Sequence, residues 1–174
     1  VMDRSPEGLF IRTIHSVIFE ENKFKIWYVG GSDWVTKDDT QYAKYQIYYT
    51  ESKDGINFNK QGTLCLSLNE SKGEYRIGRP RVLKNDQFYE MTFTYSRLNG
   101  EVGSGYAYSK DGLSWKREDK VFPLIPYSEW NSQGINLPYT LQVGERFFLF
   151  HTGNENGKDG FGCSEIGYEQ SESE

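Results

Sequence analysis

The short apolar runs of this chain carry large side chains on both alternating faces. In one of them, Phe24, Ile26 and Tyr28 alternate with Trp27 and Val29. A strand with one face in water carries apolar residues mainly at every second position, whereas a strand covered on both faces reads as a nearly continuous apolar run. The pattern therefore predicts strands in sheets that are packed between other layers.

A seven-residue segment occurs twice with little change. Residues 52–58 read Ser-Lys-Asp-Gly-Ile-Asn-Phe, and residues 109–115 read Ser-Lys-Asp-Gly-Leu-Ser-Trp. Each copy follows a tyrosine-rich run that is typical of a strand. Because aspartate and glycine tolerate positive φ, Asp-Gly between two such runs favours a hairpin with a type I′ turn.

A second signature, an aromatic run of strand length, occurs three times. Each copy follows a short apolar run and a polar turn, so that the unit is a hairpin, a third strand, and a turn into a fourth strand. The three aromatic runs are residues 24–29, 88–93 and 147–152, and the turns before them are Glu21-Asn22, Asn85-Asp86 and Gly144-Glu145. Four antiparallel strands repeated at this period are typical of β-propeller blades.

We therefore predict an all-β fold made of about three four-stranded antiparallel blades in a single partial propeller domain, residues 1–168. The blades are expected at about 14–66, 78–122 and 136–168. Thirteen Tyr, 11 Phe, four Trp and 18 Gly support the all-β class, because aromatic residues favour pleated sheets and glycine favours turns.

The third repeat is incomplete, since it has no apolar run for a fourth strand. Residues 8–13 are candidates to complete this blade, and residues 169–174 are expected to form a flexible acidic tail. Propellers usually contain four to eight blades, and three blades in a row leave two outer faces uncovered. We therefore expect a homodimer in which two chains complete a ring.

Charge and hydropathy exclude several partners. The net charge of −5 and the pI of about 5.2 argue against nucleic acid, because binding phosphate backbones requires a basic surface. No apolar run reaches the length of a membrane span. No charged start followed by an apolar segment precedes the first predicted strand, so we expect a cytoplasmic protein.

The metal-binding and redox-active residue types are few. Cys65 and Cys163 do not form a close pair, and His15 and His151 have no cysteine or carboxylate at metal-ligand spacing. We therefore expect two structural thiols, no metal and no cofactor.

The turns and strand entries resemble a known group. The Ser-x-Asp-Gly-x-x-Trp turns, the aromatic second strands, the entry at residues 78–82 and the Gly-Phe-Gly at 160–162 resemble the five-bladed propellers of glycoside hydrolase families 43 and 32. The most similar members are uncharacterised proteins of polysaccharide gene clusters. The resemblance covers residues 15–168 as the last three of five blades, and it implies a sugar ligand.

The resemblance also implies carboxylates at the start of the innermost strand of each blade. Hydrolysis of a glycosidic bond requires a proton donor and a second carboxylate. The equivalent segments here, residues 13–16, 78–80 and 136–138, contain neither Asp nor Glu. If the chain is a hydrolase, we expect Glu129 as the proton donor and Glu74 as its partner, because both precede an innermost strand.

Other polar residues at these entries favour binding. His15, Arg79 and Asn136 stand at corresponding places in the three blades, so a ring would bring them to one end of its axis. Imidazole, guanidinium and amide groups suit the hydroxyls or the carboxylate of a sugar. Structural roles are the alternative: Arg79 would bridge blades to backbone carbonyls, and Asn136 would cap a turn.

Two tryptophans lie outside the predicted strands. Trp34 lies in the long excursion 30–41, and Trp130 lies in a polar loop. Loop tryptophans can stack on the apolar face of a sugar, although they can equally cover a junction between blades.

Three functions therefore remain open. The first is a carbohydrate-binding or structural module related to glycoside hydrolases, which the missing carboxylates favour. The second is an active glycosidase or glycosyl-transfer enzyme that uses Glu129 and Glu74. The third is a platform for protein interactions, and the fold alone does not decide among them.

Overall fold

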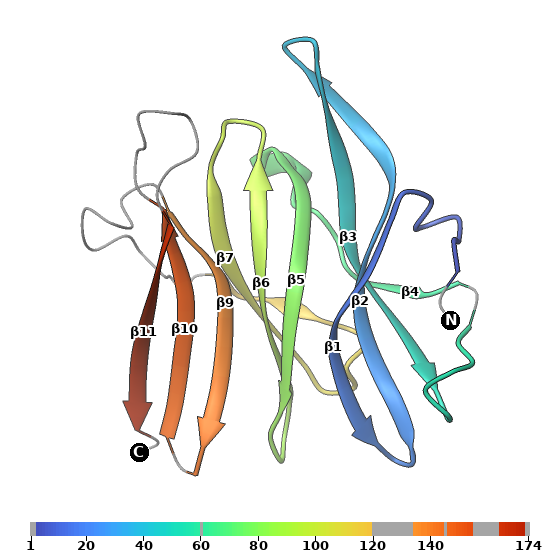
Figure 1. Ribbon diagram of the computed structural model, residues 1–174, viewed down its shortest axis with the longest axis vertical. Helices are drawn as coiled ribbons and strands as arrows, with labels where there is room; N and C mark the ends of the chain where they lie inside the picture. Colours follow the sequence, from blue (N-terminus) through green and yellow to red (C-terminus); the bar gives the residue numbers. More distant parts are fainter. Residues whose placement is uncertain (1–2, 60, 120–133, 145, 155–163, 173–174) are drawn as a thin grey trace.

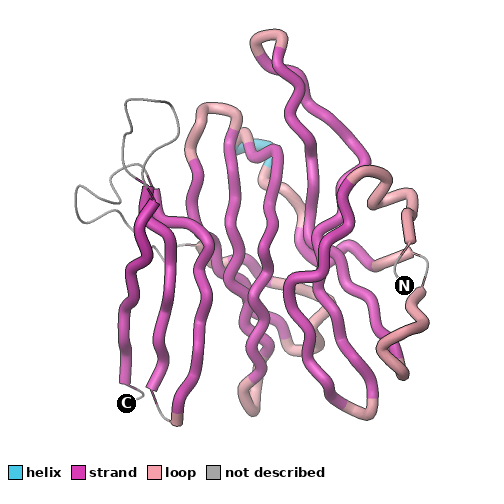
Figure 2. The backbone as a smooth tube through the Cα atoms, viewed as in Figure 1, coloured by secondary structure: helices cyan, strands magenta, loops and turns pink. Residues whose placement is uncertain are grey.

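The computed structural model describes residues 3–59, 61–119, 134–144, 146–154 and 164–172. Strands make up nearly all the regular structure of these residues, as Figure 2 shows. The exception is a single turn of 3-10 helix, η1 (Glu70–Lys72). The predicted all-β class is confirmed, and no helix in this part of the chain is long and apolar enough to cross a membrane.

The strands form three antiparallel sheets that follow one another along the chain, and a single parallel pairing of Tyr45 with Arg76 joins the first two (Figure 1). The first contains, in spatial order, β1 (Ile11–Glu20), β2 (Lys23–Lys37), β3 (Thr40–Ser52) and β4 (Thr63–Leu66). The second contains β5 (Glu74–Lys84), β6 (Tyr89–Arg97), β7 (Val102–Ser109) and β8 (Lys116–Arg117). The third contains β9 (Gly134–Val143), β10 (Arg146–Asn154) and β11 (Ser164–Glu172).

Two segments differ from expectation. Ile11, Arg12 and Thr13 belong to β1 and pair with β2, so they contribute to the first sheet and not to the last. Glu169 to Glu172 are the end of β11, which pairs with β10, and are not a loose tail. Hydrogen bonding between backbones determines the position of both segments. The sequence did not indicate these positions, because neither segment has the continuous apolar pattern of a buried strand.

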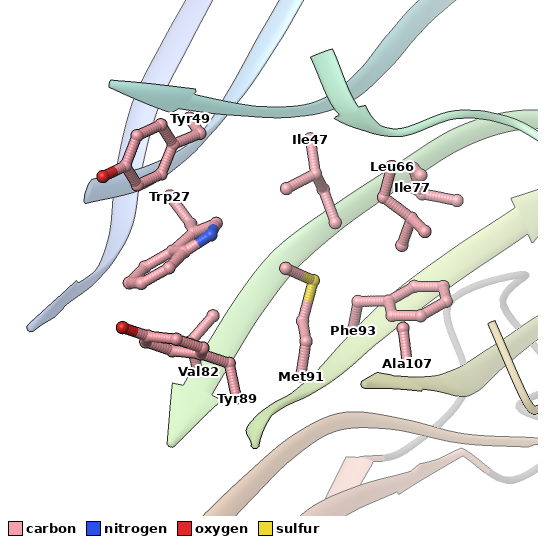
Figure 3. Packing of buried hydrophobic residues seen from close by; sticks show 10 residues of the cluster. All are labelled: Trp27, Ile47, Tyr49, Leu66, Ile77, Val82, Tyr89, Met91, Phe93 and Ala107. Carbon is pink, nitrogen blue, oxygen red and sulfur yellow. The ribbon is translucent and has the colours of Figure 1, made fainter. Parts of the chain in front are cut away.

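The main core lies between the first and second sheets (Figure 3). Trp27, which is fully buried, packs against the rings of Tyr49 and Tyr89. The remaining members are apolar residues from both sheets: Ile47, Leu66, Ile77, Val82, Met91, Phe93 and Ala107. Burial of this apolar area between two sheets is the main stabilising term of the pair.

One hydrogen bond connects the first sheet to the Ser-x-Asp-Gly turn of the second sheet. The indole N–H of Trp27 donates to the carbonyl oxygen of Gly112, at 2.9 Å. Trp115 donates to the same oxygen from within the turn. A Cβ at Gly112 would lie 3.0 Å from the Trp27 ring, and Gly112 has φ of 75°, so glycine fits here on two grounds.

The two repeated turns share the hydrogen bonds of their serine and aspartate side chains to the backbone of the glycine and the two residues after it, but they are not type I′ turns. In the second copy, Ser109 Oγ accepts the N–H of Gly112, and Asp111 Oδ1 accepts the N–H groups of Leu113 and Ser114. Only the glycine has positive φ, whereas a type I′ turn needs it at two residues. The prediction of turn type was wrong, because side-chain oxygens and not a tight hairpin hold this backbone.

A charged network links the first two sheets at the opposite end from the β2–β3 turn. Lys25, which is buried, donates to Glu20 at 2.6 Å and to the hydroxyl of Tyr89 at 2.9 Å. Tyr89 and Lys84 also donate to Glu20. Although desolvation opposes ionisation of Glu20, hydrogen bonds from Lys25, Lys84 and Tyr89 lower its pKa to about 2.

This network makes the stability of the fold sensitive to acid. Because the pKa of Glu20 is lowered on folding, its contribution is present above the ordinary carboxyl range and is lost as the pH falls toward 2. We expect Glu20→Gln to be less stable than wild type at pH 7, with the difference shrinking steadily between pH 5 and pH 2. Urea denaturation across this range measures it, and a difference that is constant with pH would contradict the assignment.

Candidate functional site

The first strands of the three sheets lie next to one another, and each has an irregularity in the same region. The register of β1 shifts at His15, and that of β5 and β9 shifts across the dipeptides Arg79-Pro80 and Leu137-Pro138. A β-bulge bends its strand and redirects a side chain, and bulges are frequent beside functional sites.

Two of these bulges contain a strained residue. Arg79 has φ of 55° and Leu137 has φ of 56°, and each is followed by proline. Non-glycine residues seldom adopt positive φ, and the surrounding structure must compensate for the cost. Leu137 is therefore the counterpart of Arg79, and Asn136 is the counterpart of Gly78, one position away from the correspondence expected from the sequence.

A central cavity of about 390 Å³ opens between these strands. His15 from β1, Arg79 from β5 and Asn136 from β9 all line it, so the structure brings together these three predicted residues. The other polar side chains at its wall are Thr13, Tyr45, Arg76, Thr94 and Ser96. The described residues that line the cavity include neither Asp nor Glu.

The electrostatics of the central cavity favour an anionic or hydroxylated ligand. Desolvation, and then the positive charge of Arg79, lower the pKa of His15, even though its side chain is exposed at the surface. Arg79 is also exposed, and no hydrogen bond or ion pair joins its guanidinium to another described residue. This part of the chain therefore shows no bridge from Arg79 to carbonyl groups.

A second guanidinium in the cavity escaped prediction. Arg76 donates to Ser96 Oγ at 3.0 Å and lies over the rings of Tyr45 and Tyr75. Arg76 lies on β5 because this strand begins at Glu74, four residues before Gly78, where the sequence analysis expected the second blade to start. Residues two apart on a strand face the same side, so extending the strand from Gly78 back to Arg76 would have predicted this position.

Glu74 has a structural partner. Its side chain is fully buried, and its two oxygens accept hydrogen bonds from Arg117 at 2.7 and 2.8 Å. The N–H of Asn69 also donates to Glu74. Glu74 does not line the central cavity, so the geometry is that of an ion pair between the first and last strands of one sheet and not that of a catalytic acid.

Trp34 lies in a different setting from the predicted loop. It is part of β2, paired with Ala43 of β3, in a hairpin that projects beyond the sheets (Figure 1). Asp38 and Asp39, both with positive φ, close this hairpin. Trp34 does not line the central cavity, and both Glu129 and Trp130 fall outside the described residues.

The described residues contain no cluster of three or more His, Cys, Asp or Glu side chains that could hold a metal ion. Cys65 is a free thiol whose pKa is raised to about 12 by burial, which makes it a poor nucleophile.

Comparison with known proteins identifies the family. The model of the β-1,4-mannooligosaccharide phosphorylases, glycoside hydrolase family 130, matches residues 34–159. The chain belongs to this family. The resemblance of the sequence motifs to the propeller families 43 and 32 is confirmed, and the family that the chain belongs to is the related family 130.

Two similar proteins are each longer than the part that this chain matches. An uncharacterised protein of Mycobacterium tuberculosis is 26% identical over 150 residues, which are 85% of this chain and 48% of that protein. A 1,2-β-oligomannan phosphorylase of Thermoanaerobacter is 35% identical over 86 residues, or 47% of this chain and 29% of that protein. The chain spans about half the length of the curated relatives that it matches over most of its length.

Solved structures show the same fold at low identity. A family 117 glycoside hydrolase of Zobellia galactanivorans has a TM-score of 0.75 at 15% identity, covering 98% of this chain and 55% of its own. A β-1,2-mannobiose phosphorylase of Listeria innocua, in complex with β-1,2-mannobiose, has a TM-score of 0.62 at 13% identity, covering 90% and 54%. The β-propeller architecture is thereby confirmed.

The structural role of Glu74 can be tested directly. Glu74→Gln leaves Arg117 with Asp119 as its one remaining carboxylate partner among the described residues, so we expect the free energy of unfolding to fall by about 2 kcal/mol, the contribution of a hydrogen bond to a charged group. Glu70→Gln is the control, because Glu70 pairs with Lys44 at the exposed surface and should cost less than about 1 kcal/mol. Chemical denaturation measures both, and equal stability of the two variants would contradict the structural role.

Proposed function

We propose that the central cavity binds a mannoside together with inorganic phosphate, and that it forms the ligand-binding side of a phosphorolysis site. The observation that carries this proposal is a cavity with two guanidinium groups, an imidazole and an amide but no carboxylate among its described lining residues. The activities of the family and of the Thermoanaerobacter relative support a mannoside as the sugar.

Phosphorolysis is compatible with a cavity wall that has cationic side chains and no carboxylate among its described residues. In hydrolysis, one carboxyl group protonates the leaving oxygen while a second carboxylate activates water or attacks the sugar. In phosphorolysis, a phosphate oxygen attacks the anomeric carbon as the glycosidic bond breaks, so that one acid suffices. Guanidinium groups bind phosphate through charge-assisted hydrogen bonds and would neutralise it during the attack.

Each wall residue has a distinct part in this proposal. Arg79 supplies a cation that has no partner among the described residues, whereas Arg76 is oriented by Ser96 and Tyr45. His15 with a lowered pKa can accept a hydrogen bond from a hydroxyl, and Asn136 can donate and accept. Glu129 remains the proposed proton donor.

A binding module without catalysis is the second candidate. It is favoured by the same lack of carboxylates at the described wall, and it uses the same cavity. The two candidates differ in product: phosphorolysis of a β-mannobiose would release mannose 1-phosphate only when phosphate is present, whereas a binding module would retain the sugar unchanged.

Loss of Arg79 should weaken phosphate binding. We expect Arg79→Ala to raise the Kd for inorganic phosphate by about tenfold or more, because a hydrogen bond to a charged group contributes about 1.5–3 kcal/mol. Arg81→Ala is the matched control, since Arg81 stacks on Tyr139 at 4.3 Å and does not line the cavity. Isothermal titration calorimetry measures both, and unchanged binding in Arg79→Ala would refute the site.

The exposed apolar face of the first sheet supports the proposed homodimer. Ile14, Val17 and Phe19 of β1 are 46%, 48% and 59% exposed, and the second sheet covers only the other face. We propose that a second copy of the chain covers this face and contributes to a closed ring. Light scattering at micromolar concentration should give the mass of a dimer for wild type and of a monomer for Val17→Glu, and a monomeric wild type would contradict the proposal.

A further inference from the structure

Four positions on one face of the second sheet form a patch at the wall of the central cavity. Arg76 and Gly78 of β5 are the cross-strand partners of Ser96 and Thr94 of β6. Cross-strand partners, and residues two apart on one strand, share a face of the sheet. All four residues line the central cavity. We call these four residues the β5–β6 patch.

The guanidinium of Arg76 is held in place while most of its donors stay unused. Its Nε donates to Ser96 Oγ at 3.0 Å, and the guanidinium lies over the rings of Tyr45 and Tyr75. Its two terminal amino groups, Nη1 and Nη2, make no hydrogen bond or ion pair with another described residue. A planar fork with free N–H groups matches two oxygens of an oxyanion.

The hydroxyls of Ser96 and Thr94 each accept a hydrogen bond from the protein and donate none. Ser96 Oγ accepts from Arg76, and Thr94 Oγ1 accepts the backbone N–H of Leu137 at 3.0 Å. Neither O–H group donates to another described residue. Ser96 is only 3% exposed, and a buried donor without an acceptor is unfavourable. Both O–H groups are therefore available to an acceptor in the cavity.

Glycine at position 78 keeps the patch open. Because Gly78 has no side chain, the cross-strand partner of Thr94 places no group over the Thr94 hydroxyl. A Cβ at Gly78 would also lie 3.1 Å from the ring of Tyr45, which is tighter than ordinary contact. Glycine therefore allows Tyr45 to approach β5 closely beside Arg76.

The chemistry of the β5–β6 patch restricts the choice of ligand. The patch offers N–H and O–H donors and one positive charge, and it contains no carboxylate. Sugar hydroxyls donate as well as accept, whereas the oxygens of inorganic phosphate mainly accept. Hydrogen bonds to an oxyanion are charge-assisted and stronger than those between neutral groups. The patch therefore favours phosphate over a sugar hydroxyl.

We propose that the β5–β6 patch is the phosphate subsite of the central cavity. Arg76 contacts two phosphate oxygens, and the hydroxyls of Ser96 and Thr94 donate to the phosphate beside it. A bidentate guanidinium contact fixes the orientation of the phosphate as well as its position. Because other residues hold these donors before the ligand arrives, binding requires little ordering. This inference rests on the proposed function and assigns a place to its phosphate.

The remaining polar residues of the wall then serve the sugar. His15 of β1 and Asn136 of β9 line the same cavity from other strands. Neutral imidazole and amide groups both donate and accept hydrogen bonds, which suits sugar hydroxyls. Arg79 follows Gly78 in the chain and adds its charge beside the patch. Changes in the patch should therefore alter the affinity for phosphate and not the affinity for the sugar.

Separate titrations of phosphate and sugar test the subsite. Inorganic phosphate and β-1,4-mannobiose are each titrated calorimetrically into the full chain, and circular dichroism checks the fold of every variant. Arg76→Lys keeps the charge but loses the planar fork, and Thr94→Val keeps the shape but loses the hydroxyl. Each should raise the Kd for phosphate about tenfold and leave the Kd for mannobiose unchanged. Thr94→Ser, which keeps a hydroxyl, should bind phosphate as wild type does.

Thr92→Val is the matched control for Thr94→Val. Thr92 also lies on β6 and donates to the carbonyl of Pro138 on β9, at 3.4 Å, but it does not line the central cavity. Its loss disturbs the contact between the same two sheets and should leave phosphate binding unchanged.

The outcomes separate this inference from the proposed function. If Arg76→Lys and Thr94→Val bind phosphate as wild type does, the subsite is refuted and the proposed function stands. The subsite is also refuted if Thr92→Val weakens phosphate binding as much as Thr94→Val, or if the patch variants weaken mannobiose binding equally. If Thr94→Val does not fold, Arg76→Lys decides. If wild type binds no phosphate, the proposed function fails as well.

Discussion

Face-to-face packing of the first two sheets is the constraint on which the rest of the structure depends. Trp27 lies fully buried between them and donates its indole hydrogen to Gly112 of the second sheet. Because this hydrogen bond has a direction, it fixes the position of one sheet on the other in a way that apolar contact alone does not. The relative placement of β1 and β5, and with it two walls of the central cavity, follows from that packing.

Some charged residues of the chain have a partner of opposite charge within the fold, and others do not. Glu74 with Arg117, and Glu20 with Lys25, are buried pairs whose charges are neutralised within or between sheets. Arg79 has no such partner among the described residues, and it lines the central cavity. A carboxylate near an innermost strand is therefore a weak indication of catalysis until its neighbours are known, because the same residue type serves both purposes.

The central cavity also depends on local backbone strain. Arg79 and Leu137 occupy the same place in two successive sheets, each with positive φ and each before a proline. Because the same unfavourable conformation occurs in two blades, the bulge is a regular structural feature of the blade and not an isolated irregularity. By bending the first strand of each sheet, the bulges bring side chains of β5 and β9 to the cavity wall, and they account for the nearness of Arg79 and Asn136.

The sequence by itself determined the strand content, the repeat and the place of the first strands, because these depend on alternation and on turn residues that are close together in the chain. It also brought His15, Arg79 and Asn136 to one candidate site, since the first strands of the repeated sheets meet around a shared centre, although Asn136 matches Gly78 and not Arg79. Only the tertiary structure decided that Arg117 neutralises Glu74 and that Trp34 lies on a paired hairpin beside Phe10. These outcomes depend on contacts between residues that are far apart in the chain, and local pattern carries no information about which distant partner will be present.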